Sequence, residues 1–255
     1  MSKKELKLLH LYPDLLNLYG DFGNILAFLK RGKVHGIEIS YHSLHLGEQK
    51  DLSSYDLFFM GGGQDREQEA LFRDVLSRRS QFERLLQGGW PFLAICGAYQ
   101  LLGKRFITAE GQCIEGLGLL DVDTRAGEKR LIGDSLYCAD FLAERGPDAE
   151  LLYGFENHSG RSYLGANATA LAKCLYAYGN NGEDDYEGCR AGNFIATYSH
   201  GPFLPKNPAM TDYLLECALL RRYEKEVQLP YELSAAELAA RKSAAALIER
   251  RKKER

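Results

Sequence analysis

The residue of this sequence that is best suited to do chemistry is a cysteine at the end of a short apolar run. Residues 92–95 are apolar, Cys96 and Gly97 follow, and residues 98–102 continue at helical spacing. A strand that turns abruptly into a helix holds the residue at the bend in a strained, exposed position. The N–H groups at a helix start favour a thiolate, which attacks carbonyl carbons. The pattern indicates a nucleophile, although a lone cysteine on an apolar strand is more often a core residue.

A nucleophilic cysteine needs a group that takes and returns a proton, and histidine does this near neutral pH. His200 follows the apolar run 194–198 and precedes a Gly-Pro pair, which is typical of an exposed loop at a strand end. His158 is the strongest rival, because residues 154–160 form another polar loop bounded by glycines. The six histidines of the chain are His10, His35, His42, His45, His158 and His200.

Attack on an amide also creates an oxyanion, which needs N–H donors. Gly61, Gly62 and Gly63 follow the apolar run 56–60 directly, so no side chain obstructs their backbone N–H groups. The N–H of Gly97, at the bend itself, is the natural second donor. Three glycines also fit a flexible tight turn without any chemistry.

Strands that alternate with helices must position these residues. The expected strands are 6–12, 37–41, 56–60, 92–95 and 194–198, and the expected helices are 25–31, 71–86, 208–223 and 234–255. This alternation predicts an α/β fold with a mostly parallel sheet and helices on both faces. Ligands bind at the carboxyl ends of such strands, where the glycines and Cys96 both lie. The stretch 116–155 contains only shorter strand-like pieces. For the last helix, which has a basic end, a solvated and partly frayed helix is favoured over a docking helix.

Composition narrows the class of protein. The chain has 255 residues, 45% hydrophobic and 26% charged, with a net charge of −3. These values indicate one substantial domain and give no basis for nucleic-acid binding. No apolar run of 18 residues is present, and the apolar stretch near the start is too short for a signal peptide, so we expect a cytoplasmic protein. The six cysteines form no CxxC pair, and we expect no metal and no cofactor.

Three segments taken together resemble the motifs of class I glutamine amidotransferase domains, namely residues 61–65, 94–102 and 198–202. The branch that they resemble is the cobyric-acid-synthase-like one. The chain also resembles the small stand-alone glutaminases of that branch, at residues 11–13, 18–24 and 154–158. The resemblance implies a flavodoxin-like α/β fold, a glutaminase domain over residues 6–223 and a C-terminal helical extension over residues 224–255.

The resemblance also implies roles for three residues. Cys96 is expected to form a γ-glutamyl thioester and release ammonia, with His200 as general base and acid. Arg130 is expected to hold the glutamine, since a guanidinium pairs bidentately with an α-carboxylate; taken alone, it is an ordinary surface arginine. Most class I domains have a carboxylate two residues after the histidine, where this chain has Pro202. We therefore expect a partner carboxylate or a backbone carbonyl to orient His200, and the isolated chain to be a poor glutaminase.

The implied partner is a Mur-ligase-like subunit, MurT, in a heterodimer. It would use the ammonia and ATP to amidate D-glutamate of lipid II during peptidoglycan synthesis. This chain has no GxxxxGK[ST] segment for ATP, which supports a separate synthetase. Two alternatives stay open: a glutaminase for a cobyric-acid-like amidation, and a non-catalytic regulatory subunit that binds glutamine.

Overall fold

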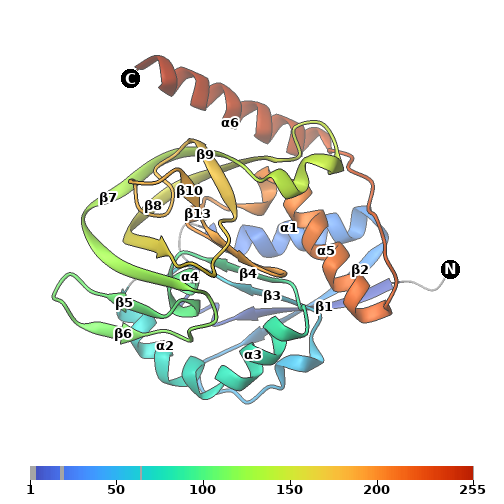
Figure 1. Cartoon of the computed structure of the whole chain (residues 1–255). Helices are drawn as coiled ribbons and strands as arrows, with labels where there is room; N and C mark the ends of the chain where they lie inside the picture. Colours follow the sequence, from blue (N-terminus) through green and yellow to red (C-terminus); the bar gives the residue numbers. More distant parts are fainter. Residues whose placement is uncertain (1–3, 18–19, 64, 255) are drawn as a thin grey trace.

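Two β-sheets carry the residues that the sequence singles out (Figure 1). The computed structural model describes residues 4–17, 20–63 and 65–254. The strands of the first sheet, in spatial order, are β11 (Cys189–Ala191), β12 (Phe194–Thr197), β4 (Phe92–Ile95), β3 (Leu57–Met60), β1 (Lys4–Leu11) and β2 (Ile37–Leu44). The α-helices are α1 (Phe22–Val34), α2 (Asp65–Ser77), α3 (Arg79–Gln87), α4 (Gly97–Leu102), α5 (Pro208–Tyr223) and α6 (Ala235–Glu254).

The first sheet is mostly parallel. Strands β2, β1, β3, β4 and β12 pair in parallel, and β11 joins the edge in the antiparallel sense. Strands β3, β4 and β12 are buried along their whole length, as strands covered on both faces must be. Helices α1 and α5 lie on one face of this sheet, and α2 and α3 lie on the other (Figure 1). The predicted α/β architecture is therefore confirmed.

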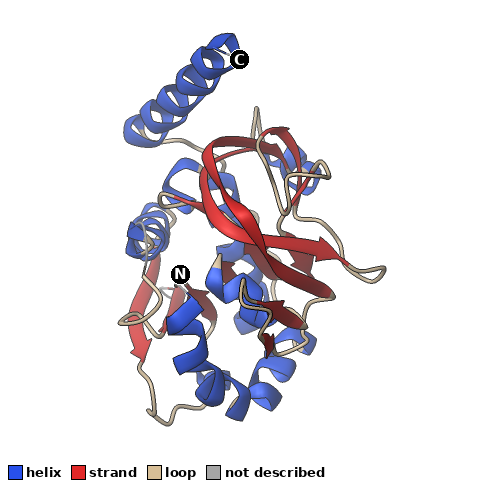
Figure 2. Ribbon diagram, turned by 90° about the vertical axis from the view of Figure 1, so that its left-hand side faces the viewer, coloured by secondary structure: helices blue, strands red, loops and turns tan. Residues whose placement is uncertain are grey.

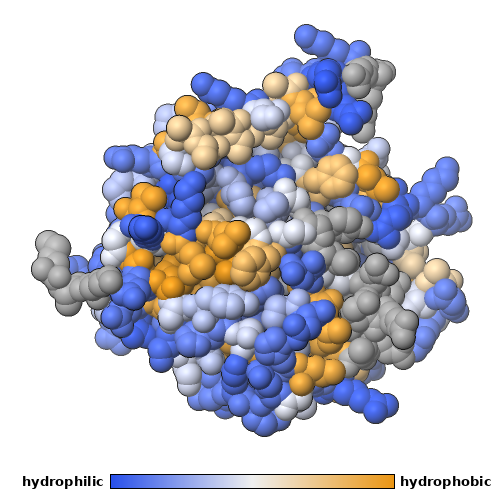
Figure 3. All heavy atoms as spheres, turned by 180° about the vertical axis from the view of Figure 1, so that it is seen from behind, coloured by the Kyte–Doolittle hydropathy of each residue, from blue (hydrophilic) through white to orange (hydrophobic). Residues whose placement is uncertain are grey.

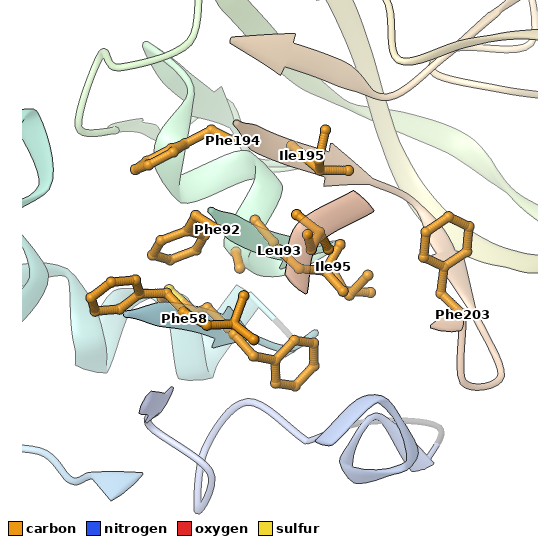
Figure 4. Packing of buried hydrophobic residues seen from close by; sticks show 14 of the residues in the cluster. Phe58, Phe92, Leu93, Ile95, Phe194, Ile195 and Phe203 are labelled. Carbon is orange, nitrogen blue, oxygen red and sulfur yellow. The ribbon is translucent and has the colours of Figure 1, made fainter. Parts of the chain in front are cut away.

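A row of phenylalanines locks three neighbouring strands together (Figure 4). Phe92 on β4 lies in register with Phe58 on β3 and Phe194 on β12. Its ring centroid lies 5.9 Å from that of Phe58 and 4.9 Å from that of Phe194, and Phe82 of α3 packs over it at 5.9 Å. Each such aromatic pair adds about 0.5–1.5 kcal/mol beyond the burial of its area. The sheet is thus firmly packed four residues before Cys96.

The second sheet was not predicted. Its strands are β5 (Arg105–Ile107), β6 (Cys113–Glu115), β7 (Val122–Cys138), β8 (Leu151–Leu164), β9 (Ala172–Tyr176), β10 (Tyr186–Glu187) and β13 (Ser199–His200). The expected short pieces within 116–155 are parts of a long antiparallel ribbon, β7 and β8, whose register shifts between Ala126 and Leu131. The sequence hides this ribbon because the centre of β7 is polar and exposed. The parallel sheet that the sequence predicts therefore accounts for only about half of the strands in the described part of the chain.

His200 belongs to this second sheet. After β12, the chain leaves the parallel sheet, and β13 pairs antiparallel with β8, where His200 lies opposite Phe155. The β12–β13 segment thus joins the two sheets at the carboxyl end of the parallel strands. That crossing sets where the histidine lies relative to Cys96.

The C-terminal helix α6 is anchored to the body of the protein, contrary to the favoured expectation of a solvated helix. Ser234 and Glu237 form a reciprocal capping box at its start. The Arg241 guanidinium donates to three backbone carbonyls, and Ile248 is buried. The far end of α6 extends away from the two sheets (Figure 2), and the side chains at that end are mostly hydrophilic (Figure 3). Among the described helices, none is long and apolar enough to cross a membrane.

Candidate active site

Cys96 lies at the bend between β4 and α4 and has a strained backbone. Its φ of 51° and ψ of −101° are rare for a residue with a Cβ, and such strain clusters at functional sites. Its N–H donates to the Thr197 carbonyl at 2.8 Å, and its own carbonyl accepts from Gln100. The predicted strand-to-helix elbow is therefore present.

The thiol is less accessible than we expected. Cys96 is only 8% exposed. A Cβ built on Gly62 would lie 3.3 Å from the Cys96 Cβ, so the glycine backbone packs directly against the nucleophile. Helix α4 has only six residues, and a titratable side chain also interacts with the sulfur.

That side chain is His200, which is fully buried beside Cys96. Burial lowers the pKa of His200, but the Cys96 sulfur and the Asp21 carboxylate outweigh burial and raise the pKa from 6.5 to about 10. The imidazole therefore carries a positive charge at neutral pH. A cation next to a thiol stabilises the thiolate. The two residues that the sequence placed on different strand ends are brought together.

Asp21 is a further residue of the site, which the sequence analysis did not single out. It precedes α1 and is fully buried. Its Oδ1 lies 3.5 Å from His200 Nδ1, and its Oδ2 accepts the Gly62 N–H at 2.7 Å. The only signal was its place in the segment 18–24, part of the resemblance, of which residues 18 and 19 lie outside the described residues. Nothing in the spacing pairs position 21 with position 200.

The glycines surround this group, but they do not have equal roles. Gly62 lies between the catalytic candidates, because a Cβ on it would lie 2.7 Å from His200 Cε1. Its N–H donates to Asp21 Oδ2 at 2.7 Å, and its expected use as an oxyanion donor stays a prediction. Gly63 and Gly97 are both buried near the bend and stay candidates for that role.

Arg130 lies on the exposed wall that β7 and β8 form. Its Nε donates to Asn157 Oδ1 and its Nη2 donates to the Asn157 carbonyl, each at 2.8 Å. The positive charges of Arg130 and His200 both act on His158. This shared neighbour places the Arg130 guanidinium within electrostatic range of the site. Its expected contact with glutamine stays a prediction.

His158, the rival base, is neutral. Burial lowers its pKa to about 3, and the charges of Arg161, His200 and Arg130 lower it further, against the raising effect of the Gly160 carbonyl. Its Nδ1 lies 2.8 Å from that carbonyl, and its ring stacks on Tyr198 with centroids 3.8 Å apart. A histidine held neutral by packing cannot serve as the cationic partner of Cys96, which favours His200.

A buried polar network supports the segment that carries His200. The Glu187 carboxylate accepts from the Thr197 hydroxyl at 2.5 Å and from the Tyr198 N–H at 2.7 Å. The Tyr198 hydroxyl in turn accepts from Gln100 of α4 at 3.1 Å. Burial and the nearby Glu156 raise the pKa of Glu187 to about 8. The network ties β12 to the helix that follows Cys96.

Comparison with known proteins identifies the class that this fold and site define. Residues 7–208 match the model of the CobB/CobQ-like glutamine amidotransferase domain. The chain belongs to this family. It is 40% identical over 218 residues to the Staphylococcus aureus protein named lipid II isoglutaminyl synthase (glutamine-hydrolyzing) subunit GatD, with 86% of each chain covered. The Streptococcus pneumoniae protein of the same name is 36% identical, over 89% of this chain and 85% of that protein.

More distant matches agree on the domain. A cobyric acid synthase of Chlorobium chlorochromatii is 27% identical over 79% of this chain, which corresponds to 40% of that longer protein. Among solved structures, a Thermotoga maritima glutamine amidotransferase has a TM-score of 0.55 at 17% identity, covering 96% of this chain and 94% of that chain. The predicted family and its class I glutamine amidotransferase fold are confirmed.

Proposed function

We propose that this chain is the glutaminase subunit of a two-protein amidotransferase that modifies lipid II. The observation that carries the proposal is the Cys96 thiol at a strained elbow beside a cationic His200. The similarity to proteins named GatD, over 86% of this chain, supports the acceptor. On the same similarity, we infer that the partner is a Mur-ligase-like subunit, MurT, that binds ATP and amidates D-glutamate.

The first half-reaction releases ammonia. The Cys96 thiolate attacks the side-chain amide carbon of glutamine, a C–S bond forms, and the carbonyl electrons move to the oxygen. N–H donors at Gly63 and Gly97 stabilise that oxyanion. His200 then gives its proton to the amide nitrogen as the C–N bond breaks. Ammonia leaves, and a γ-glutamyl thioester and a neutral His200 stay behind.

The second half-reaction restores the enzyme. Neutral His200 takes a proton from water, the resulting hydroxide attacks the thioester carbon, and the C–S bond breaks. Glutamate leaves, and the thiolate and the imidazolium form again. The net reaction converts glutamine and water to glutamate and ammonia. Arg130 holds the substrate α-carboxylate, with its guanidinium oriented by Asn157.

The test measures glutamate and ammonia release by the purified chain, with and without a co-expressed Mur-ligase-like partner. Cys96→Ala is expected to abolish release, because it removes the nucleophile. Amidation of lipid II by the pair, with glutamine as the nitrogen source, tests the acceptor. Release that persists in Cys96→Ala would contradict the glutaminase assignment, and release without lipid II amidation would contradict the proposed acceptor.

A further inference from the structure

The long ribbon of β7 and β8 bulges at the segment that carries Arg130. The register shifts between Ala126 and Leu131, whose partners on β8 are only two positions apart. The four residues 127–130 therefore lie opposite Ser159 alone. Extra residues on one strand have no ladder partners and bend that strand out of its regular course. Arg130, which is expected to hold glutamine, thus belongs to a stretch of backbone that the sheet itself does not fix.

The side chain of Arg161 fills the inside of this bulge. Its Nη1 donates to the Ser159 carbonyl at 2.9 Å, and its Nη2 donates to the Lys129 carbonyl at 2.6 Å. A Cβ built on Gly127 would lie 2.8 Å from Arg161 Cζ, so the guanidinium packs directly against the backbone of the bulge. A guanidinium is a rigid fork, and two bonds to it fix both acceptors relative to each other. Arg161 therefore ties the residue before Arg130 to β8.

The Arg130 guanidinium lies over β8 with one edge left for a ligand. Its Nε and Nη2 both donate to Asn157. The remaining N–H groups, on Nη1 and Nη2, form the end-on fork that matches a carboxylate. Asn157 and Arg161 lie on the same face of β8, because an even number of positions separates them in one strand. Asn157 holds the side chain of Arg130, and Arg161 holds the backbone that leads to it.

The charges around Arg161 favour this role over simple stabilisation of the ribbon. On the neighbouring strands, Arg105 of β5 pairs with Asp123 of β7. Arg161 forms no such ion pair within the described part of the chain, and its bonds go to backbone carbonyls. It also lies directly opposite Arg125 in the register, where two like charges cost stability. The contacts of Arg161 are those of a clamp on the bulge.

We propose that Arg161 is a positioning residue for substrate binding, whose fork clamps the 127–130 bulge so that Arg130 presents its remaining edge to the α-carboxylate of an amino-acid substrate. This inference rests on the proposed glutaminase function and on the expected role of Arg130. Arg161 acts through Arg130 and does not touch the substrate. Since no bond to the α-carboxylate forms or breaks, loss of the clamp weakens the binding of substrate and transition state alike.

Arg161→Ala tests the proposal through kcat and KM for glutamine, measured on the chain in complex with its co-expressed partner. We expect KM to rise about tenfold while kcat stays within about twofold of wild type, the pattern of lost uniform binding. Arg125→Ala is the matched control, because it removes the same charge from the opposing position of the ribbon. It should keep the wild-type KM. A wild-type KM in Arg161→Ala, or an equal rise in Arg125→Ala, would overturn the proposal.

Gly127→Ala disturbs the clamp without removing a charge. The new Cβ would lie 2.8 Å from Arg161 Cζ and 2.9 Å from the Ser159 carbonyl oxygen, so the guanidinium must leave its place. We expect KM for glutamine to rise as in Arg161→Ala, with kcat near the wild-type value because Cys96 and its surroundings are unchanged. A wild-type KM in this variant would contradict the need for the clamp.

A double variant shows whether Arg161 acts through Arg130. In the Arg130→Ala background, Arg161→Ala should raise KM by less than about twofold more, because the group that it positions is gone. A further rise of about tenfold would mean that Arg161 acts on the substrate itself, and would overturn the positioning role.

The proposals fail in distinguishable ways. A wild-type KM in Arg130→Ala would remove the expected role of Arg130, and this inference with it, but would leave the glutaminase function standing. Glutamine hydrolysis that persists in Cys96→Ala would contradict the glutaminase function itself.

Discussion

At the residue scale, the site depends on a glycine, which has no side chain, as much as on the side chains that surround it. Cys96, His200 and Asp21 meet around the backbone of Gly62, which has room for nothing larger. His200 is cationic because two anionic neighbours outweigh its burial, whereas His158, buried without such a neighbour, is neutral. The same residue type thus has opposite protonation states within one site.

Gly62→Ala tests this steric requirement. The new Cβ would lie 2.7 Å from His200 Cε1, so the imidazole must move away from Cys96. We expect kcat for glutamine hydrolysis to fall about 10²-fold, since small displacements of catalytic groups have effects of that size. Gly133→Ala on β7, where the nearest atom would lie at 3.6 Å, is the control and should keep wild-type kcat. Wild-type turnover by Gly62→Ala would show that the site tolerates the displacement.

At the element scale, the segment from β12 to β13 is held by the buried carboxyl group of a glutamate. Glu187, on the short strand β10, accepts from Thr197 and Tyr198, which lie just before His200. Its pKa of about 8 lies above the 4.5 of an ordinary glutamate, because burial disfavours the ionised form. The folded protein therefore binds this proton more tightly than the unfolded chain does. Stability from this group is complete below pH 4.5 and is lost as the pH rises through 8.

Glu187→Gln should remove that pH dependence while preserving an acceptor for the two donors. We expect the wild type to lose stability from pH 5 to pH 8 relative to the variant, by an amount on the order of a few kcal/mol. Thermal or urea unfolding at both pH values measures the difference. Glu183→Gln, at an exposed position near the same turn, serves as the control. Parallel stability curves for wild type and Glu187→Gln would contradict a buried, proton-binding Glu187.

At the scale of the whole molecule, the two sheets and α6 form one packed unit. Arg241 of α6 donates to the carbonyls of Leu151, Lys206 and Asp148. These residues lie at the start of β8, at the end of the loop beyond His200, and in the segment just before β8. The Arg31 guanidinium of α1 donates to Asp212 of α5 and lies within ion-pair range of Glu237. The C-terminal helix therefore fastens elements of both sheets, although the predicted boundary at residues 223–224 stays a prediction.

Arg241→Ala should separate this stabilising role from catalysis. Three carbonyls lose a charged donor, so we expect a loss of about 2 kcal/mol in the free energy of unfolding. For a chain of this size, that loss lowers the Tm by about 4–8 °C. Lys242→Ala, at the exposed neighbouring position, should leave the Tm unchanged. The kcat at 25 °C should stay at the wild-type value in both variants, and a loss of kcat in folded Arg241→Ala would give α6 a part in the reaction.

The sequence alone determined the local parts of this protein. The apolar runs before Gly61, Cys96 and Tyr198 specify buried parallel strands, because fully covered strands need continuous apolar residues. The small residues around Cys96 specify the elbow, and the motifs identify the family. Each of these depends on neighbours within a few positions, and such patterns can be read along the chain.

Only the tertiary structure decided what depends on distant contacts. The β7–β8 ribbon is stabilised by pairing across a polar register shift, which leaves no clean alternation to read. The protonation of His200 and His158 follows from neighbours on other elements, because burial and charge act through space. Asp21 reaches His200 across 179 positions, since α1 packs against the loop beyond β13. The sequence alone identified Cys96 as the nucleophile and His200 as its histidine. The fold places the Asp21 carboxylate in contact with both His200 and Gly62.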